Sequence, residues 1–238
     1  MKTVSLICVV KNEIDGLKHC FKNIDTNLFK EIVFLDGNSN DGSKEFINDQ
    51  IKKSILINQS KGQTISDGLI EIIDKCKSEY LIFYQPDGNC DASYLPYFLK
   101  LIDESDYDLI IASRYKDNAK SYDDNLVSKF GNYFFTKLIN FLFNKKLTDV
   151  MVGYRACKRD TLISYDISNK KYYKKLENLL DTSLSWDPLM TAIYSKENLR
   201  IIEFPADEPA RVGGIMKRNS FKWGLAYFLQ ILFIKFFY

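Results

Sequence analysis

Short runs of β-branched and aromatic residues alternate with helix-length amphipathic stretches through the first half of the chain. These apolar runs lie near residues 3–10, 31–36, 54–58, 80–84 and 108–113. Such alternation is typical of parallel strands joined by helical crossovers, because each crossover must return the chain to the same end of the sheet. The pattern therefore predicts an α/β fold with a mixed, mostly parallel sheet between helices.

The pattern changes beyond about residue 125. An aromatic-rich stretch at 125–144 predicts a long helix, residues 187–196 predict another, and residues 200–205 predict a strand. No repeat or linker interrupts the 238 residues, of which 46% are hydrophobic, enough for a sizeable core. We expect one large domain over 1–218, followed by an apolar helix over 219–238.

Two of the apolar runs end in the same kind of turn. An Asp-Gly-Asn sequence begins at Asp36 after one run, and a second begins at Asp87 after another. Open α/β sheets bind their ligands at the carboxyl ends of the strands. Carboxylates at two such ends indicate a nucleotide-handling enzyme.

Charge and motif content exclude several other functions. Lys and Arg number 33 and Asp and Glu 31, so the net charge of +2 gives no reason to expect nucleic-acid binding. The only histidine, His19, is next to Cys20 on an expected helix, where neighbours do not face each other, so His-based catalytic devices are excluded. The sequence has neither a P-loop nor a Gly-x-Gly-x-x-Gly motif after the first strand.

The five cysteines and the amino terminus indicate a compartment. The cysteines are widely spaced and form no Cys-x-x-Cys pair, which fits a reduced, cytosolic setting. Residues 1–10 are apolar, but they have one early Lys and no small-residue cleavage site. We therefore expect a first buried strand there and not a signal peptide.

Six segments in a fixed order carry a resemblance to a known family. They are VVKNE at 9–13, LDGNSNDGS at 35–43, QPDG at 85–88, IASRY at 111–115, DVMVGYR at 149–155 and RVGGIMK at 211–217. Over about residues 3–217 the chain resembles the family 2 glycosyltransferases, which have the GT-A fold. The last two segments are similar to those of the branch with dolichyl-phosphate mannose synthases and bacterial polyprenyl-phosphate sugar transferases.

The resemblance implies an inverting transferase that takes a sugar from a nucleotide-sugar donor. Asp36 and Asp41 would contact the base and ribose, because carboxylates accept hydrogen bonds from ring N–H and hydroxyl groups. Asn12 and Glu13, just past the first strand, would line the same rim. The alternative for both aspartates is stabilisation of their own turns.

The resemblance also implies a divalent metal, Mg²⁺ or Mn²⁺, with Asp87 as its main ligand and a participant in catalysis. These ions take one or two carboxylates together with phosphate oxygens and water. The family motif is commonly Asp-x-Asp. Here Gln85 stands in its first position and is a candidate ligand, while Asn89 or Asp91 would supply a further oxygen. The alternative is a plain Pro-Asp-Gly turn.

Asp149 matches the aspartate upstream of Gly-Phe-Arg in the family and is the candidate catalytic base or acceptor-orienting residue. A hydroxyl acceptor needs a base to remove its proton, whereas a polyprenyl phosphate is already anionic. The alternative is a loop aspartate that pairs with Arg155. Both possibilities are open at this point.

Four cations are candidates for phosphate binding, and three of them, Arg155, Arg211 and Lys217, lie near glycines in segments that we expect to be loops. Arg211 would bind the nucleotide diphosphate, while Arg155, Lys217 and Arg114 would bind the acceptor or a phosphate. Met216 replaces the usual Ser before Lys217. Arg114, at a strand end, is equally suited to pairing with a carboxylate.

Residues 221–238 form an apolar tail whose core, 223–234, is interrupted only by Gln230. This stretch is shorter than the ~20 residues that cross a bilayer. The preceding Lys217, Arg218 and Lys222 favour an interfacial helix on anionic lipid, while packing on the domain or on a second subunit is the alternative. We expect a cytoplasmic protein, peripheral on the inner face of the membrane, and leave a homo-oligomer open.

The sequence thus predicts transfer of a sugar to a polyprenyl phosphate, in the synthesis of the cell envelope. A glycan or lipid hydroxyl is the alternative acceptor. Two other classes compete. A sugar nucleotidyltransferase would begin with a Gly-rich loop where this chain has Lys11-Asn12-Glu13. A catalytically inactive, membrane-associated nucleotide-binding module is suggested by Gln85.

Overall fold

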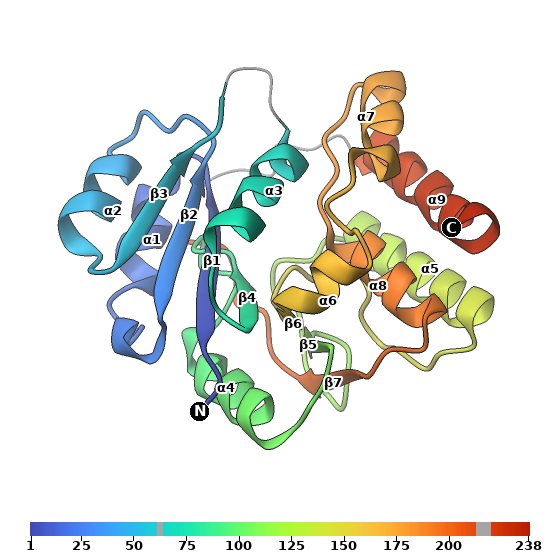
Figure 1. The fold of residues 1–238 in the computed structure, drawn as a ribbon, viewed down its shortest axis with the longest axis horizontal. Coiled ribbons are helices and arrows are strands. Elements are labelled where there is room, and N and C mark those ends of the chain that lie inside the picture. Colours follow the sequence, from blue (N-terminus) through green and yellow to red (C-terminus); the bar gives the residue numbers. More distant parts are fainter. Residues whose placement is uncertain (61–63, 213–219) are drawn as a thin grey trace.

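The computed structural model describes residues 1–60, 64–212 and 220–238, with only the backbone of Ser220 (Figure 1). Within these residues one seven-stranded sheet has the order β3-β2-β1-β4-β6-β5-β7. The strands are β1 (Val4–Val10), β2 (Glu31–Asp36), β3 (Ser54–Asn58), β4 (Tyr80–Tyr84), β5 (Leu109–Ser113), β6 (Arg155–Lys158) and β7 (Ile201–Pro205). All neighbours are parallel except β6, which is antiparallel to both β4 and β5. The predicted α/β class and mixed sheet are confirmed.

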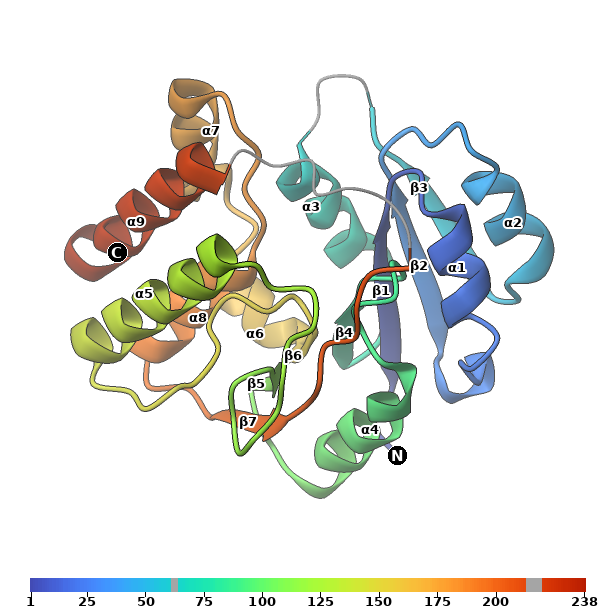
Figure 2. The ribbon, with the colours of Figure 1, turned by 180° about the vertical axis from the view of Figure 1, so that it is seen from behind.

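Helices lie on both sides of the sheet, with α3 in front of it in Figure 1 and α1 in front in Figure 2. The helices are α1 (Ile14–Cys20), α2 (Ser43–Gln50), α3 (Ile65–Lys75), α4 (Leu95–Glu104), α5 (Leu126–Phe143), α6 (Arg159–Ser164), α7 (Lys174–Leu180), α8 (Asp187–Lys196) and α9 (Ser220–Phe237). Short 3₁₀ turns are η1 (Thr26–Leu28), η2 (Ala92–Tyr94) and η3 (Lys170–Tyr172). In both views α5 and α9 lie side by side at one end of the molecule.

Strand β6 is the one described strand that the sequence did not predict. Arg155 was expected in a loop, but it is the first residue of a four-residue strand that separates β4 from β5. The strand is short and has a charged residue at each end, so it lacks the long apolar run that marked the others. That expectation for Arg155 is wrong.

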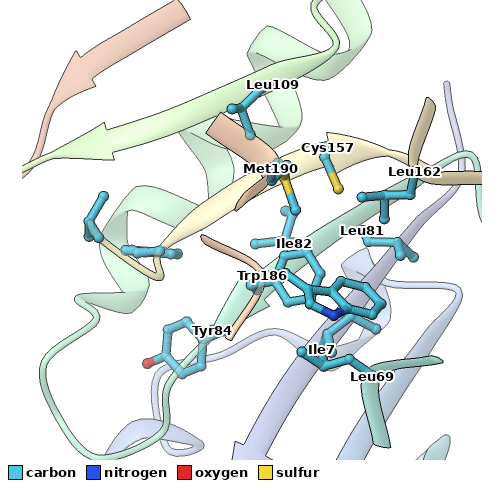
Figure 3. Close-up of a cluster of buried hydrophobic side chains, with 14 of the residues drawn as sticks. Ile7, Leu69, Leu81, Ile82, Tyr84, Leu109, Cys157, Leu162, Trp186 and Met190 are labelled. Atoms are coloured by element: carbon cyan, nitrogen blue, oxygen red, sulfur yellow. The ribbon is translucent and has the colours of Figure 1, made fainter. Parts of the chain in front are cut away.

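The core explains why the central strands are uniformly apolar. All five residues of β4 and all five of β5 are buried, because helices cover both faces of the sheet. Trp186, just before α8, is 2% exposed and lies beside Ile7 and Ile82 (Figure 3). Burial of each such side chain stabilises the fold by about 1.5–3 kcal/mol.

The C-terminal helix α9 packs against α5, α7 and α8. Its buried residues recur with helical spacing: Ala226, Tyr227, Gln230, Ile231 and Ile234. Gln230, the one polar residue of the apolar stretch, donates from Nε2 to the carbonyl oxygen of Tyr172 at 2.8 Å. No helix in the described parts of the chain combines the length and apolar character needed to cross a membrane.

Candidate active site

The loops that follow β1 and β2 are joined by hydrogen bonds at the carboxyl edge of the sheet. The Asn12 N–H donates to Ser39 Oγ at 2.8 Å, and the Asn40 N–H donates to Asn12 Oδ1 at 2.9 Å. The Glu13 N–H donates to Ser43 Oγ at 3.1 Å. Asn12 and Glu13 therefore lie beside the 36–43 turn, on the rim where the sequence predicted them.

Asp41 fastens the same two loops together. Its carboxylate accepts from the backbone N–H of Ile14 at 3.0 Å and from the N–H and hydroxyl of Ser43 at 3.0 and 2.6 Å. Burial opposes the charge, but the hydrogen bonds from Ser43 and Ile14 outweigh it and lower the pKa of the carboxyl. The turn-stabilising alternative is thus observed for Asp41, and its contact with a nucleotide stays a prediction.

Asp36 is fully buried at the end of β2. Its carboxylate accepts from the Ser39 N–H at 3.0 Å and pairs with Lys44 at 3.3 Å. These contacts stabilise the turn after β2. The turn-stabilising alternative is thus observed for Asp36, and its contact with the base or ribose stays a prediction.

The turn after β4 approaches helix α1 closely. A Cβ on Gly16 would lie 2.3 Å from the carbonyl oxygen of Pro86, so only glycine permits this approach. Gly88 has φ of +95°, a conformation that favours glycine. The two glycines fix the position of Asp87 at the edge of the sheet.

Asp87 pairs with Arg211 across this edge. Arg211 Nη1 lies 3.0 Å from Asp87 Oδ2, and its Nη2 lies 3.5 Å from Asp123 Oδ2. Asn89 donates from Nδ2 to the same Asp123 oxygen at 2.9 Å. The structure thus brings Asp87, Asn89 and Arg211 together, and it adds Asp123, which no sequence motif identified.

The oxygens around Asp87 fit a hard divalent cation. Asn89 Oδ1 is buried and has no hydrogen-bond partner among the described residues, which leaves a carbonyl-type ligand available. Burial raises the pKa of Asp87, partly offset by the Asn89 N–H and by Arg211. No cluster of three or more His, Cys, Asp or Glu suitable for a metal exists in the described residues, so the diphosphate would have to complete the coordination.

Gln85, the third predicted metal ligand, faces other groups. Its Oε1 accepts from Cys90 Sγ at 3.3 Å, and its amide nitrogen would lie 2.0 Å from a Cβ on Gly153. The side chain is therefore packed against the glycine of the 149–155 segment. Its part in metal binding stays a prediction.

Asp149 is fully buried in an ion pair with Arg114. Arg114 donates from Nε to Asp149 Oδ2 at 2.7 Å and from Nη2 to Oδ1 at 3.1 Å. Oδ1 also accepts from the backbone N–H groups of Met151 and Val152 at 3.3 and 3.2 Å. This carboxylate shapes its own loop, and its partner is Arg114, not Arg155 as the alternative had it.

Arg114 is enclosed by carboxylates. Glu208 lies 3.3 Å and Asp124 3.8 Å from its Nη1. Burial opposes its charge, but Asp149 first and then Glu208 and Asp124 raise the pKa of the guanidinium. The pairing with carboxylates that the sequence gave as the alternative is thus observed for Arg114, and its contact with a phosphate stays a prediction.

Arg155 is also fully buried. Its guanidinium donates to the carbonyl oxygens of Val150, Val152 and Asp187 and to Thr191 Oγ1. A phosphate has no access to a guanidinium so enclosed. The observed position corrects the expectation that Arg155 binds an acceptor phosphate, and Lys217 lies outside the described residues.

A cavity of about 150 Å³ lies beside this edge. Its lining comes from β1, α3, β4 and the start of α8: Ile7, Val9, Ile65, Leu69, Phe83, Tyr84, Gln85, Ser185, Trp186, Asp187 and Met190 (Figure 3 shows several of them). Asp36 and Asp87 do not line this cavity. Asp36 ends β2 and Asp87 lies in the turn after β4, and these two strands lie on either side of β1, two strand spacings or ~10 Å apart.

Asp187 is the carboxylate of this cavity. Its Oδ2 accepts from Ser185 Oγ at 2.7 Å, and its Oδ1 lies 3.7 Å from Arg155 Nε. The side chain keeps 19% of its surface exposed, whereas Asp149 keeps none. Sequence reasoning missed Asp187, although a carboxylate followed by proline at the predicted start of a helix at 187 was a usable signal.

Comparison with known proteins identifies related sequences and folds. Residues 5–165 match the family described as Glycosyl transferase family 2. "Glycosyltransferase AglJ" of Haloferax volcanii is 22% identical over 173 residues, which are 71% of this chain and 55% of that protein. The chain thus spans about half the length of this curated relative.

Solved structures show the same fold at low identity. Glucosyl-3-phosphoglycerate synthase from Mycobacterium tuberculosis, in complex with Mn²⁺, UDP and glucosyl-3-phosphoglycerate, superposes with a TM-score of 0.67 and 12% identity, covering 98% of this chain and 80% of the other. S. aureus TarS 1–349 gives a TM-score of 0.59 and 14% identity, covering 88% and 59%. The predicted GT-A fold is thereby confirmed.

Proposed function

The chain belongs to glycosyl transferase family 2, and we propose that it moves a sugar from a nucleotide-sugar donor to a polyprenyl phosphate at the cytoplasmic face of a membrane. Family membership gives glycosyl transfer. The acceptor, the membrane and the dolichyl-phosphate mannose synthase branch are our proposal.

The donor would lie over the carboxyl edge of β1, β2 and β4, with its diphosphate near Asp87 and Arg211. Arg211 is half-buried, and its guanidinium fork suits a diphosphate once it leaves Asp87. Asp87 and Asn89 would hold Mg²⁺ or Mn²⁺, which neutralises the leaving diphosphate when bound. A solved relative of the same fold contains Mn²⁺ and UDP together, which supports this assignment.

The observation that carries the lipid acceptor is an apolar surface on α5 and α9, which we call the α5–α9 face. Its large apolar side chains are between 39% and 87% exposed. They are Leu126, Val127, Phe130, Tyr133, Phe134 and Phe141 of α5, and Phe221, Leu225, Phe233, Phe236 and Phe237 of α9. A soluble protein seldom leaves so many aromatic side chains in water unless they meet a partner or a membrane.

The charges of these two helices point to anionic lipid. Neither α5 nor α9 contains Asp or Glu, and their charged residues are Lys129, Lys137, Lys222 and Lys235. In a chain of net charge +2, this gathers cations beside exposed aromatic residues. Such a combination is typical of helices that lie in a membrane interface.

A hydroxyl acceptor is the second candidate, favoured by Asp187 in the cavity. The acceptor oxygen would bond to the anomeric carbon, while the bond from that carbon to the diphosphate breaks and its electron pair leaves with the nucleoside diphosphate. The hydroxyl proton would pass to Asp187. A phosphate acceptor would attack in the same way without releasing a proton.

The test is a transfer assay with UDP-, GDP-, CMP- and dTDP-sugars and Mn²⁺, offered either polyprenyl phosphate in anionic vesicles or soluble glycans. We expect transfer to the polyprenyl phosphate. Transfer only to a hydroxyl supports the second candidate, and donor binding without any turnover supports the inactive module.

Flotation with the same vesicles tests whether the α5–α9 face binds lipid. We expect the double variant Phe130→Ser and Phe236→Ser to lose most vesicle binding, while Tyr97→Ser on α4, which is 44% exposed, binds as the wild type does. Equal binding by all three proteins, or equal binding to neutral and anionic vesicles, contradicts the proposed lipid contact.

A further inference from the structure

Helix α9 is hydrogen-bonded to the segment that carries the cavity carboxylate. The Ser185 N–H donates to Tyr227 Oη at 2.9 Å, and Ser185 Oγ lies 2.7 Å from the same oxygen. Tyr227 Oη also lies 3.0 Å from the carbonyl oxygen of Ser185. A single residue of α9 thus binds Ser185 at three atoms, two positions before Asp187.

The protons of this network have one consistent direction. Ser185 Oγ lies 2.7 Å from Asp187 Oδ2, and an ionised carboxylate only accepts, so the serine hydroxyl donates its one proton there. The single proton of the Tyr227 hydroxyl is then shared between Ser185 Oγ and the carbonyl oxygen of Ser185, to which Tyr227 also donates at 3.0 Å. The hydrogen bonds therefore run from Tyr227 through Ser185 to Asp187.

The tyrosine hydroxyl is held rigidly. Tyr227 is fully buried, with its ring edge-on to Trp223 at 4.2 Å and to Phe135 at 6.5 Å between centroids. A buried hydroxyl without partners is destabilising, so the aromatic packing and the bonds to Ser185 fix each other.

Asp187 is fixed from its other side as well. Arg155 donates from Nη1 to the backbone carbonyl of Asp187 at 2.7 Å, and its Nε lies 3.7 Å from Asp187 Oδ1. The carboxylate therefore has one oxygen on the Ser185 hydroxyl and one near a buried guanidinium. Its remaining exposed surface lies at the cavity.

We propose that Tyr227 and Ser185 are positioning residues that hold Asp187 at the orientation needed for sugar transfer, so that turnover depends on the seating of α9. The proposal rests on the proposed glycosyl transfer, but it holds for either acceptor, because Asp187 can accept from a sugar hydroxyl or from an acceptor hydroxyl. Tyr227 belongs to a helix beyond the part of the chain that matches the family. The same helix exposes Phe233 and Phe236 of the α5–α9 face. Binding of lipid at that face and the orientation of the Asp187 side chain are therefore linked through one helix.

The test compares Tyr227→Phe with a matched control, Tyr80→Phe. Tyr80 is also buried and also donates to a backbone carbonyl, that of Tyr107 at 2.8 Å, but it lies at the amino end of β4, away from the cavity. We expect Tyr227→Phe to lower kcat about 10-fold with the donor KM within twofold. The control is expected to keep the wild-type kcat.

A double-mutant cycle separates positioning from general loss of structure. In an Asp187→Asn background, Tyr227→Phe should lower kcat no further, because its effect passes through the carboxylate. The proposal is overturned if Tyr227→Phe lowers kcat by the same factor in the Asp187→Asn background as in the wild type. It is also overturned if Tyr227→Phe alone has the wild-type kcat.

Hydrogen exchange gives a readout that does not need turnover. Tyr227→Phe removes the acceptor of the Ser185 N–H, so exchange at that amide should rise at least 10-fold, with no change in Tyr80→Phe. Unchanged exchange at Ser185 overturns the proposed network. A wild-type protein that transfers no sugar from any donor, with the exchange result as expected, contradicts the proposed function instead.

Discussion

Asp149 and Asp187 are two aspartates about forty positions apart that have opposite surroundings. Asp149 is fully buried, and Arg114 and two backbone N–H groups satisfy its oxygens. Asp187 lies at the start of α8, held by Ser185 and Arg155, and lines a cavity. The aspartate within the motif has a structural position, while the one outside it has the accessible position.

The difference indicates what the 149–155 segment does. Asp149 fixes the loop that leads to Gly153, and Arg155 binds both that loop and the start of α8. The segment therefore holds the start of α8, and with it the backbone of Asp187, in place. A sequence motif can mark the frame of a site as well as its reacting groups.

The largest expected effect is that of Asp187→Asn. If this carboxylate takes part in transfer, kcat should fall about 100- to 1,000-fold, the range for loss of a general base or a transition-state contact. The free energy of unfolding should change by less than about 1 kcal/mol, because asparagine still accepts from Ser185. Kinetics and urea unfolding measure the two quantities, and near-normal kcat would remove Asp187 from the mechanism.

Asp149→Asn should show the reverse pattern. Removing the charge leaves Arg114 in a buried setting with one partner fewer, so we expect a loss of about 3 kcal/mol of stability. Activity at a temperature where the variant is folded should stay within about tenfold of the wild type. A stable variant with almost no activity would instead restore Asp149 as the catalytic base.

Arg211 and Arg155 extend the comparison to the cations, because the Arg211 side chain is half-buried whereas that of Arg155 is fully buried. Arg211→Ala should raise the donor Kd about tenfold, or about 1.4 kcal/mol, through loss of a diphosphate contact. Thermal-shift titration with each donor and Mn²⁺ measures this. If Arg211→Ala binds the donor as the wild type does, or binds it more tightly than the wild type when no metal is added, Arg211 only neutralises Asp87.

The smallest effect concerns Asp67, a carboxylate of α3 that does not line the cavity. Burial opposes ionisation of Asp67, but Lys174, the Thr64 N–H and Lys170 lower its pKa to about 2. A depressed carboxyl pKa stabilises the fold above the ordinary value near 3.8, and that contribution is lost as pH falls toward 2. Asp67→Asn should cost about 1 kcal/mol at pH 7, after allowance for solvent screening, and progressively less below pH 4.

Urea unfolding from pH 7 to pH 3 measures this dependence. Asp74→Asn, an exposed position on the same helix, serves as the control and should unfold as the wild type does at every pH. A difference between Asp67→Asn and wild type that does not shrink on acidification would contradict the assigned charge interactions.

The sequence predicted most of the fold because its strands are buried on both faces and stand out as apolar runs. The helices at 126–143 and 187–196 were predicted from the length and composition of their segments. Strand β6 was missed because four residues with charged ends carry no such signal. Its pairing with β4 and β5 depends on contacts far away in the sequence.

The candidate site was only partly predictable. Asp87, Asn89 and Arg211 lie together as the motifs suggested, because parallel strands end at one edge. The burial of Asp36, Asp149 and Arg155 could not be foreseen, since burial depends on neighbours such as Lys44, Arg114 and α8 that no local pattern specifies. Asp187 reaches the cavity through tertiary packing just before α8, where Trp186 lies edge-on to Phe83 of β4.

The insertion of β6 between β4 and β5 constrains the order in which a ribosome-bound chain can become compact. Strands β1 to β4 are mutually adjacent and can assemble once residue 84 has emerged, but β5 has no neighbour until β6 and β7 are synthesised. At about 5–20 residues per second, β5 waits several seconds with unpaired edges. We expect the nascent chain to recruit chaperones most strongly between the emergence of residue 113 and that of residue 158.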